Sequence, residues 1–240
     1  MIGLGTIINV AAVIIAGIIG KLFGRFVKEK YQEPIIRAIG VSVIFIGASG
    51  AFEKMFTVDN GVISTGGSML IIISMVLGTL IGEFIDIQGK IEKFGEWLKK
   101  KSGNEKDCSF VEGFVTASFT VCIGAMAIVG AIEDGLHGDY SILAAKSILD
   151  FIVIILMTAS MGIGCVFSAI PVAVLQGGVT VFAKFVEPLM TTAVLNNISL
   201  VGSVLIFCVG LNMVRPNSVK VANMLPALVI AALLVFVPGI

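Results

Sequence analysis

The chain has 240 residues, of which 57% are hydrophobic and 13% are charged, and its formal net charge is zero. Its mean hydropathy is +1.07. Soluble domains carry about 25% charged residues, so this composition excludes an ordinary soluble protein. Zero net charge without a basic, aromatic-lined stripe argues against nucleic-acid binding. We therefore predict an all-α, polytopic membrane protein, in which four scattered cysteines act as small hydrophobic side chains.

A membrane-spanning helix needs about 20 mostly apolar residues, and eight stretches qualify. They cover residues 2–23, 35–52, 66–85, 110–132, 141–166, 168–185, 191–214 and 221–237. The tight connection near Gly164 leaves seven spans as the alternative. We expect one membrane domain over residues 1–240, with three spans in 1–87, a cytoplasmic amphipathic helix and loop in 88–108, and the other spans in 109–240. Residues 2–23 lack the basic region and cleavage site of a signal peptide, so we expect a retained helix.

Lys and Arg are distributed unevenly between alternate loops. With eight spans and the N-terminus outside, thirteen of the sixteen basic residues face the cytoplasm. Lys54 and Lys184 then face outside, and Lys146 lies within the membrane. Since cytoplasmic loops are enriched in Lys and Arg, we predict a multi-pass membrane protein with both termini outside.

Residues 88–103 form the one segment with a soluble character. Ile91, Phe94, Trp97 and Leu98 recur at helical spacing, while lysines and glutamates occupy the other face. A basic amphipathic helix of this kind is typical of a helix lying in the inner headgroup layer. A plain solvated connector is the alternative.

Lys146 and Asp150 lie one helical turn apart inside the fifth predicted span. A charged side chain near the bilayer centre is costly unless it finds a partner or water, and residues at i and i+4 of one helix can neutralise each other. Ser147 and Thr158 extend the same polar face. The pair predicts either the lining of an ion or solute pathway or a buried ion pair that only fixes helix packing.

Other polar residues inside predicted spans are candidates for the same pathway. The predicted lining comprises, with Lys146 and Asp150, the amides Asn9, Gln176, Asn196 and Asn197. Amides at these depths serve equally well as hydrogen bonds between helices. In the sixth span, Pro171 and the run Gln176-Gly177-Gly178 predict an interruption at mid-depth, because Pro removes a backbone donor and Gly weakens a helix.

The loop before the fifth span is acidic. It holds Glu133, Asp134 and Asp139 together with the single histidine of the chain, His137. The carboxylates predict either an acidic mouth that concentrates cations or a turn whose Asp residues cap the fifth span, and we favour the turn. Lys146 has an alternative partner here, because its long side chain can extend outward to these carboxylates.

Three short matches relate spans one to three to spans six to eight, in the same order. They are Glu33-Pro34 with Glu187-Pro188, Gly40 with Gly202, and Ser68-Met69-Leu70 with Asn223-Met224-Leu225. A separation of five spans gives the two copies opposite orientations, which is the inverted-topology repeat of many secondary transporters. Chance similarity within an apolar alphabet is the competing explanation.

Glycines recur at helical spacing in the first and third spans. They are Gly17, Gly20 and Gly24, and Gly78 and Gly82. Small residues let neighbouring helices approach closely in membranes. We predict that these glycines are packing positions.

Six motifs of the chain form a distinctive set. They are Gly3-Leu4-Gly5-Thr6-Ile7-Ile8-Asn9, Gly78-Thr79-Leu80-Ile81-Gly82-Glu83, Gly124-Ala125-Met126, Asp134-Gly135-Leu136 with Gly138-Asp139, Ala145-Lys146-Ser147 with Leu149-Asp150, and Asn223-Met224-Leu225-Pro226-Ala227-Leu228. In these motifs the chain resembles the bacterial YqgA/YdfK family of membrane proteins, labelled domain of unknown function 554. The resemblance extends over essentially the whole chain and is most specific between Gly124 and Asp150. It implies a multi-pass protein of the bacterial cytoplasmic (inner) membrane, often described as a transporter, and assigns no substrate or functional residue.

We predict a membrane transporter or channel for a small ion or polar solute, without a cofactor or a bound metal. An enzyme is not expected, because His137 has no His or Cys at metal-ligand spacing and no Ser lies in a recognisable nucleophile elbow. A non-transporting scaffold or sensor is the alternative, and an intramembrane hydrolase using Lys146 and Ser147 is a weaker one. The expected partners are the lipid bilayer and the solute, with a homo-oligomer left open. Without paired Cys or a Met-x-x-Met run, we expect three methionines to fill the core rather than bind soft metals: Met126, Met157 and Met161.

Overall fold

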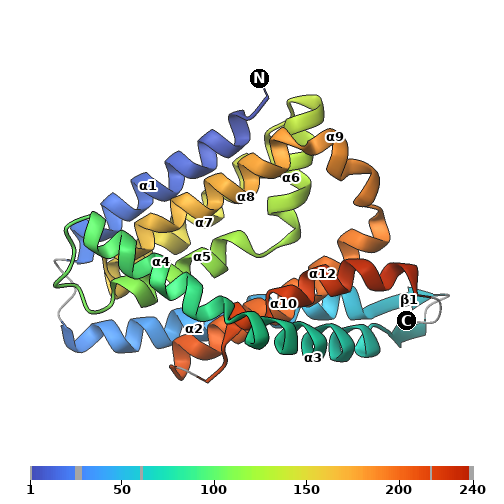
Figure 1. Ribbon diagram of the computed structural model, residues 1–240, viewed down its shortest axis with the longest axis horizontal. Coiled ribbons are helices and arrows are strands. Elements are labelled where there is room, and N and C mark those ends of the chain that lie inside the picture. Colours follow the sequence, from blue (N-terminus) through green and yellow to red (C-terminus); the bar gives the residue numbers. More distant parts are fainter. Residues whose placement is uncertain (1, 25–28, 60–61, 217, 238–240) are drawn as a thin grey trace. The chain divides into compact units, whose positions relative to one another are not determined.

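The computed structural model describes residues 2–24, 29–59, 62–216 and 218–237. Within these residues, six helical segments are long and apolar enough to cross a membrane. The chain is therefore an all-α membrane protein, as its composition predicts. The six segments are α1 (Leu4–Gly24), α2 (Glu29–Met55), α3 (Ser68–Ile85), α7 (Ser141–Met161), the 3-10 helix η1 (Ile163–Ser168) with α8 (Ala169–Val181), and α10 (Thr192–Val214) (Figure 1).

Two further predicted spans are built from shorter pieces. The fourth consists of α5 (Phe110–Cys122) and α6 (Ala125–His137), which together are apolar enough to cross a membrane but are bent by 62°. The last consists of α11 (Val221–Met224), α12 (Pro226–Leu233) and the 3-10 helix η3 (Leu234–Phe236), an apolar segment shorter than the others. Six or seven spans thus follow from length and composition, and the count of eight stays a prediction.

The break in the fourth span and the continuity of the sixth both differ from the sequence prediction. Gly124 lies at the break with a φ of +154°, a conformation that L residues with a Cβ rarely adopt. The predicted interruption at mid-depth of the sixth span was wrong, because α8 continues through Gly177 and Gly178. Pro171 lies in the first turn of α8, where the missing N–H has no helical acceptor to lose.

Backbone contacts divide the chain into two compact units. We call the first the α7 unit (Met1–Ile39, Ile91–Cys122 and Met126–Pro188) and the second the α10 unit (Gly40–Lys90, Ile123–Ala125 and Leu189–Ile240). Each is described by itself below.

In the α7 unit, α1 runs alongside α7 in the same direction. A Cβ built on Gly5 would lie 2.8 Å from Leu143, and one built on Gly24 would lie 3.0 Å from the carbonyl of Ala159. A Cβ on Gly20 would lie 2.6 Å from the carbonyl of Ile155, and one on Gly17 would lie 2.2 Å from Val166, in the 3-10 helix that follows α7. The packing role predicted for the α1 glycines is therefore confirmed.

The α10 unit contains two antiparallel helix pairs. Helix α3 packs against α11 and α12, where a Cβ on Gly78 would lie 2.4 Å from Ala227 and one on Gly82 would lie 1.8 Å from the carbonyl of Asn223. Helix α2 packs against α10 in the same way, with Gly47 facing Phe207. Apolar side chains fill the space between α3, α10 and α12, among them Leu70, Leu200, Val201, Ala227 and Ala231.

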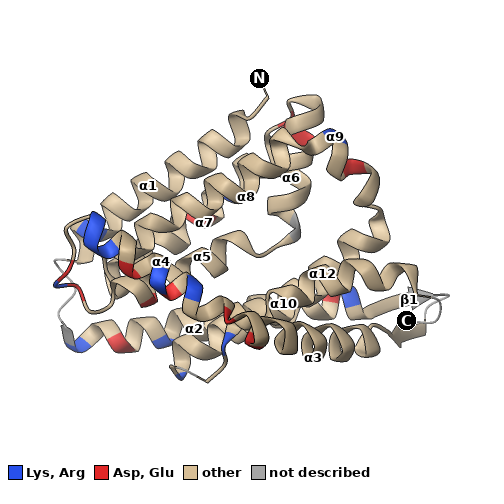
Figure 2. Ribbon diagram, viewed as in Figure 1, with Lys and Arg blue, Asp and Glu red and all other residues tan. Residues whose placement is uncertain are grey.

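The structure describes several of the connections between helices. An antiparallel hairpin of β1 (Phe56–Asp59) and β2 (Val62–Thr65) joins α2 to α3, and α9 (Ala183–Val186) with the 3-10 helix η2 (Glu187–Leu189) leads from α8 towards α10. Helix α4 (Ile87–Lys101) carries many of the charged residues in Figure 2, whereas most of the α1 and α12 ribbon is uncharged. Its Leu98 packs against Phe110 and Phe114. Its Phe94 and Trp97 are exposed, and their rings stack with centroids 5.7 Å apart. The helix predicted over 88–103 is confirmed, and its place at the membrane surface stays a prediction.

Candidate functional site

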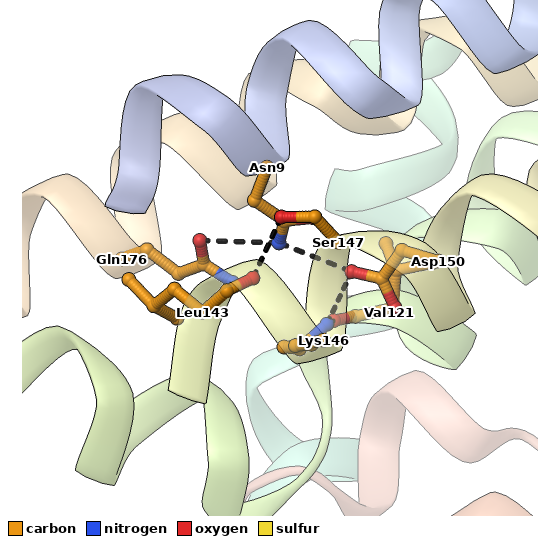
Figure 3. Close-up of polar contacts among 7 residues, drawn as sticks. All are labelled: Asn9, Val121, Leu143, Lys146, Ser147, Asp150 and Gln176. Atoms are coloured by element: carbon orange, nitrogen blue, oxygen red, sulfur yellow. Dashed lines mark hydrogen bonds and ion pairs between the residues drawn. The ribbon is translucent and has the colours of Figure 1, made fainter. Parts of the chain in front are cut away.

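The charged pair on α7 is buried, and its two side chains bind each other. Lys146 is 6% exposed and Asp150 is 7% exposed, and the Lys146 ammonium donates a hydrogen bond to the Asp150 carboxylate (Figure 3). Lys146 thus pairs with Asp150 along its own helix rather than with the carboxylates of the loop before α7. The i,i+4 spacing brings the two groups onto one helical face.

The Lys146 ammonium has a second partner at the break between α5 and α6. It donates a hydrogen bond of 2.7 Å to the carbonyl oxygen of Val121. Helix α5 ends at Cys122, so this carbonyl is among the last four of the helix and has no intrahelical N–H to accept. The C-terminal end of a helix also carries partial negative charge. A carboxylate and a helix end together neutralise the buried cation.

Two amides from neighbouring helices complete the network. The Asn9 Nδ2 group on α1 donates to the Asp150 carboxylate at 3.1 Å and to Oε1 of Gln176 on α8 at 3.2 Å. Asn9 and Gln176 are both fully buried. Among the described residues, Oδ1 of Asn9 and Nε2 of Gln176 have no hydrogen-bond partner. We call Asn9, Lys146, Asp150 and Gln176 the buried polar cluster.

Two polar atoms of the cluster have no partner among the described residues. A buried donor or acceptor without a partner costs roughly 1–3 kcal/mol, so the acceptor on Asn9 and the donor on Gln176 favour a polar ligand or water. The neighbouring hydroxyls are engaged elsewhere. Ser147 donates to the carbonyl of Leu143 at 2.6 Å, and Thr6 on α1 bonds to Thr180 on α8 at 3.3 Å.

Two other amides of the predicted lining belong to the α10 unit. Asn196 is exposed, and Asn197 donates to the carbonyl of Ala231 at 3.1 Å, which joins α10 to α12. In the part of the chain that the structure describes, the hydrogen bonds of the buried polar cluster do not reach either residue. For Asn197 the contact is a hydrogen bond between helices.

Of the three residues predicted for an acidic loop, Glu133 and Asp134 belong to helix α6 and Asp139 lies in the connection before α7. Asp134 is fully buried and accepts hydrogen bonds from the backbone N–H groups of Gly3 at 3.2 Å and Gly5 at 3.0 Å, so it satisfies the N-terminal donors of α1. Asp139 accepts from the N–H of Ser141 at 2.9 Å, at the start of α7. Hydrogen bonds from Ser141 hold the pKa of the Asp139 carboxyl below its ordinary value. Glu133 pairs with His137 at 2.8 Å.

Sequence reasoning missed the carbonyl of Val121, because a backbone acceptor leaves no signal in the residue types. The break that frees it carries only one signal, the Gly124 of an otherwise apolar run. The predicted core role of the methionines agrees with the burial of Met157 and Met161, whereas Met126 is 39% exposed.

The fold and the buried polar cluster define a multi-pass helical membrane protein with charge and amide groups inside its α7 unit. Comparison with known proteins identifies the family of the chain. Residues 4–236 match the family model described as "Protein of unknown function (DUF554)", and the chain belongs to this family. It is 30% identical over 233 residues to the "Uncharacterized membrane protein YdfK" of Bacillus subtilis (strain 168), covering 97% of this chain and 96% of that protein.

A second relative also matches over nearly the whole length of both chains. The "Uncharacterized protein YqgA" of Escherichia coli (strain K12) is 28% identical over 235 residues, which cover 95% of this chain and 94% of that protein. No solved structure matches the chain. The family and the membrane-protein character predicted from the motifs are confirmed.

Proposed function

We propose that this protein is a transporter or channel for a small ion or polar solute, and that the buried polar cluster lines its pathway. The observation that carries the proposal is the Lys146–Asp150 pair, held inside a membrane-spanning helix beside amide atoms without partners. Ionisable residues within membrane segments are rare and usually mark ion or substrate pathways. A pair that served packing alone would need neither the unpaired donor nor the unpaired acceptor.

The broken fourth span supports the same function. In many secondary transporters, discontinuous helices place their free backbone groups at the substrate or ion site. Here the carbonyl of Val121, at the end of α5, holds the ammonium of Lys146. Such irregular backbone is tolerated at membrane depth only where it contacts protein or lines a polar cavity. A cation or a proton on Asp150 would compete with Lys146 for the same negative groups.

The directions of the helices support the inverted repeat as part of the proposal. Span one pairs with span six through α1 and α8, span two with span seven through α2 and α10, and span three with span eight through α3 and α12. Each pair is antiparallel, because two contacts in each run in opposite order along the two helices: Thr6–Thr180 with Asn9–Gln176, Gly40–Met213 with Gly47–Phe207, and Gly78–Ala227 with Gly82–Asn223. Equivalent helices of an inverted repeat have opposite directions, so the pairing fits two copies related by a two-fold axis in each pair.

Reconstitution into proteoliposomes tests the proposal. The full chain should support flux of at least one solute in a panel of inorganic ions and small polar metabolites, and Asp150→Asn should abolish that flux while the protein stays folded. Glu133→Gln is the matched control, since it changes a carboxylate of the same charge near the end of α6. Purified wild-type protein with no flux across the panel would favour a non-transporting scaffold or sensor. A fully active Asp150→Asn variant would exclude Asp150 from the mechanism.

A further inference from the structure

The α7 unit contains a cleft of about 440 Å³. It lies at the C-terminal ends of α1 and α7, whereas Asp134 binds the N-terminal end of α1. Its walls come from the last turns of α1 and α7 and from the loop between α4 and α5. A volume of this size is in the range of small-molecule sites. The polar residues that line this cleft include Lys21, Asn104, Asp107, Thr158 and Ser160.

The polar lining of this cleft is balanced in charge. Lys21 contributes an ammonium and Asp107 a carboxylate, of which Oδ1 accepts the N–H of Ser109 at 3.0 Å. Ser160 is 93% buried, since 7% of its surface is exposed, and its hydroxyl has no hydrogen-bond partner among the described residues. A buried, unpaired hydroxyl in the wall of a cleft is satisfied most simply by a polar ligand.

The cleft and the buried polar cluster share one face of α7. Thr158 lines the cleft and follows Asp150 by eight residues, which is about 12 Å along the helix. Positions i, i+4 and i+8 lie on the same side of a helix. Ile154 lies between them and is fully buried, so one turn of apolar side chain separates the cleft from the charged pair.

The charges of the cleft repeat those of the cluster. Each has one Lys and one Asp, and each has a neutral hydrogen-bonding group without a partner, Ser160 in the cleft and the two amides in the cluster. In the cleft, a solute of single charge would meet one repelling group, whereas a small zwitterion would pair its carboxylate with Lys21 and its ammonium with Asp107.

We infer that this cleft binds a small zwitterionic solute of the amino-acid type on its way to the buried polar cluster. The inference rests on the proposed function and gives it a substrate class. Lys21 pairs with the carboxylate of the solute, Asp107 with its ammonium, and Ser160 donates to or accepts from either group. The buried side chain of Ile154 is then the barrier that the solute passes between the cleft and Asp150.

Thermal unfolding of the purified full chain in detergent tests the inference, because a ligand of the native state raises the unfolding temperature. The probes are glycine, L-alanine and L-serine, with methylammonium and acetate at equal concentration as the two separate halves of a zwitterion. We expect at least one zwitterion to raise the unfolding temperature and neither half to do so. Lys21→Gln and Asp107→Asn should weaken binding by about tenfold or more, since each removes a charge-assisted hydrogen bond.

Matched controls come from the same loop. Lys106→Gln and Glu105→Gln change exposed charges that do not line the cleft and should leave the affinity unchanged. Stabilisation that persists in both Lys21→Gln and Asp107→Asn would overturn the inference, because binding would then lie elsewhere.

Flux measurements separate this inference from the proposed function. If no zwitterion binds but proteoliposomes show Asp150-dependent flux of another solute, the substrate class is wrong and the transport function stands. If a zwitterion binds in the cleft as expected but no probe or panel solute crosses the membrane, the binding site stands and the transport function is wrong.

Discussion

At the scale of single residues, the Lys146–Asp150 pair should behave as one unit. Removing one partner of a buried ion pair leaves an uncompensated charge and costs about 3–5 kcal/mol. We expect Lys146→Met and Asp150→Leu each to lower the free energy of unfolding by such an amount. The double variant should lose less than the sum of the two, because no unpaired charge remains. Denaturant unfolding in mixed micelles measures all four proteins of this cycle.

The same double variant separates the two interpretations of the pair. If the pair only fixes packing, Lys146→Met with Asp150→Leu folds and keeps its flux. If Asp150 carries a proton or cation, the double variant folds and loses flux, which is the outcome we expect. Additive losses in the cycle would contradict the direct contact between the two side chains.

Asp134 should be a structural residue, although it lies in an acidic segment near the end of α6. It is fully buried and accepts hydrogen bonds from the first N–H groups of α1. Asp134→Ala should therefore destabilise the protein by roughly 0.5–2 kcal/mol, the usual range for loss of an N-terminal cap. Glu133→Ala, which breaks an exposed pair with His137, should cost less. Equal losses in the thermal unfolding of the two variants would contradict the capping role.

The residues of the buried polar cluster could be chosen from the sequence, but their meeting could not. The Lys146–Asp150 contact follows from helical periodicity, which is local. The bonds from Asn9 to Asp150 and Gln176 join residues more than a hundred positions apart, and they depend on how α1 packs against α7 and α8. Asn196 and Asn197 have the same chemistry and depth, and only packing distinguishes them from Asn9.

At the scale of helices, the close contact of α3 with α11 should depend on the absence of a side chain at Gly82. A Cβ there would lie 1.8 Å from the carbonyl oxygen of Asn223, so Gly82→Ala should force the helices apart and cost about 1–3 kcal/mol. Gly178→Ala is the matched control, because no atom lies within 4 Å of its Cβ position in α8. That variant should be more stable than the wild type by about 0.5–1 kcal/mol. Thermal unfolding of both variants tests the contrast, and a neutral Gly82→Ala would contradict the contact.

Helix positions were predictable because apolar length is a local property, and helix breaks were not. Pro171 and two glycines weaken α8 on any propensity scale, yet the helix continues, since Pro171 occupies its first turn and neighbouring helices hold the rest. The residues around Ile123 and Gly124 look continuous in an apolar run, yet there the helix breaks. The hairpin of β1 and β2, with Thr57 opposite Ser64, was not predicted, although the sequence carries its signal: Asn60-Gly61 stands between two short runs rich in β-branched residues.

At the scale of the whole molecule, the orientation in the membrane can be tested with a cysteine that the protein already has. Cys108 is exposed, whereas Cys165 is buried and Cys122 and Cys208 are partly buried within helices. The excess of Lys and Arg predicts that the Cys108 loop faces the cytoplasm. A membrane-impermeant maleimide should therefore leave Cys108 unlabelled in spheroplasts and label it after permeabilisation. Cys108→Ser should remove that labelling.

A second position gives the opposite signal in the same experiment. Ser64 is exposed in β2, in the connection predicted to face outside, so Ser64→Cys in the Cys108→Ser background should be labelled before permeabilisation. The result also decides which solution the cleft beside Lys21 and Asp107 faces, because Asp107 and Cys108 are adjacent in one loop. With Cys108 inside, the zwitterion site opens to the cytoplasm, and Asp150 lies between it and the outer surface. Labelling of Cys108 in sealed spheroplasts would invert both assignments, since the orientation of the whole chain would then be reversed.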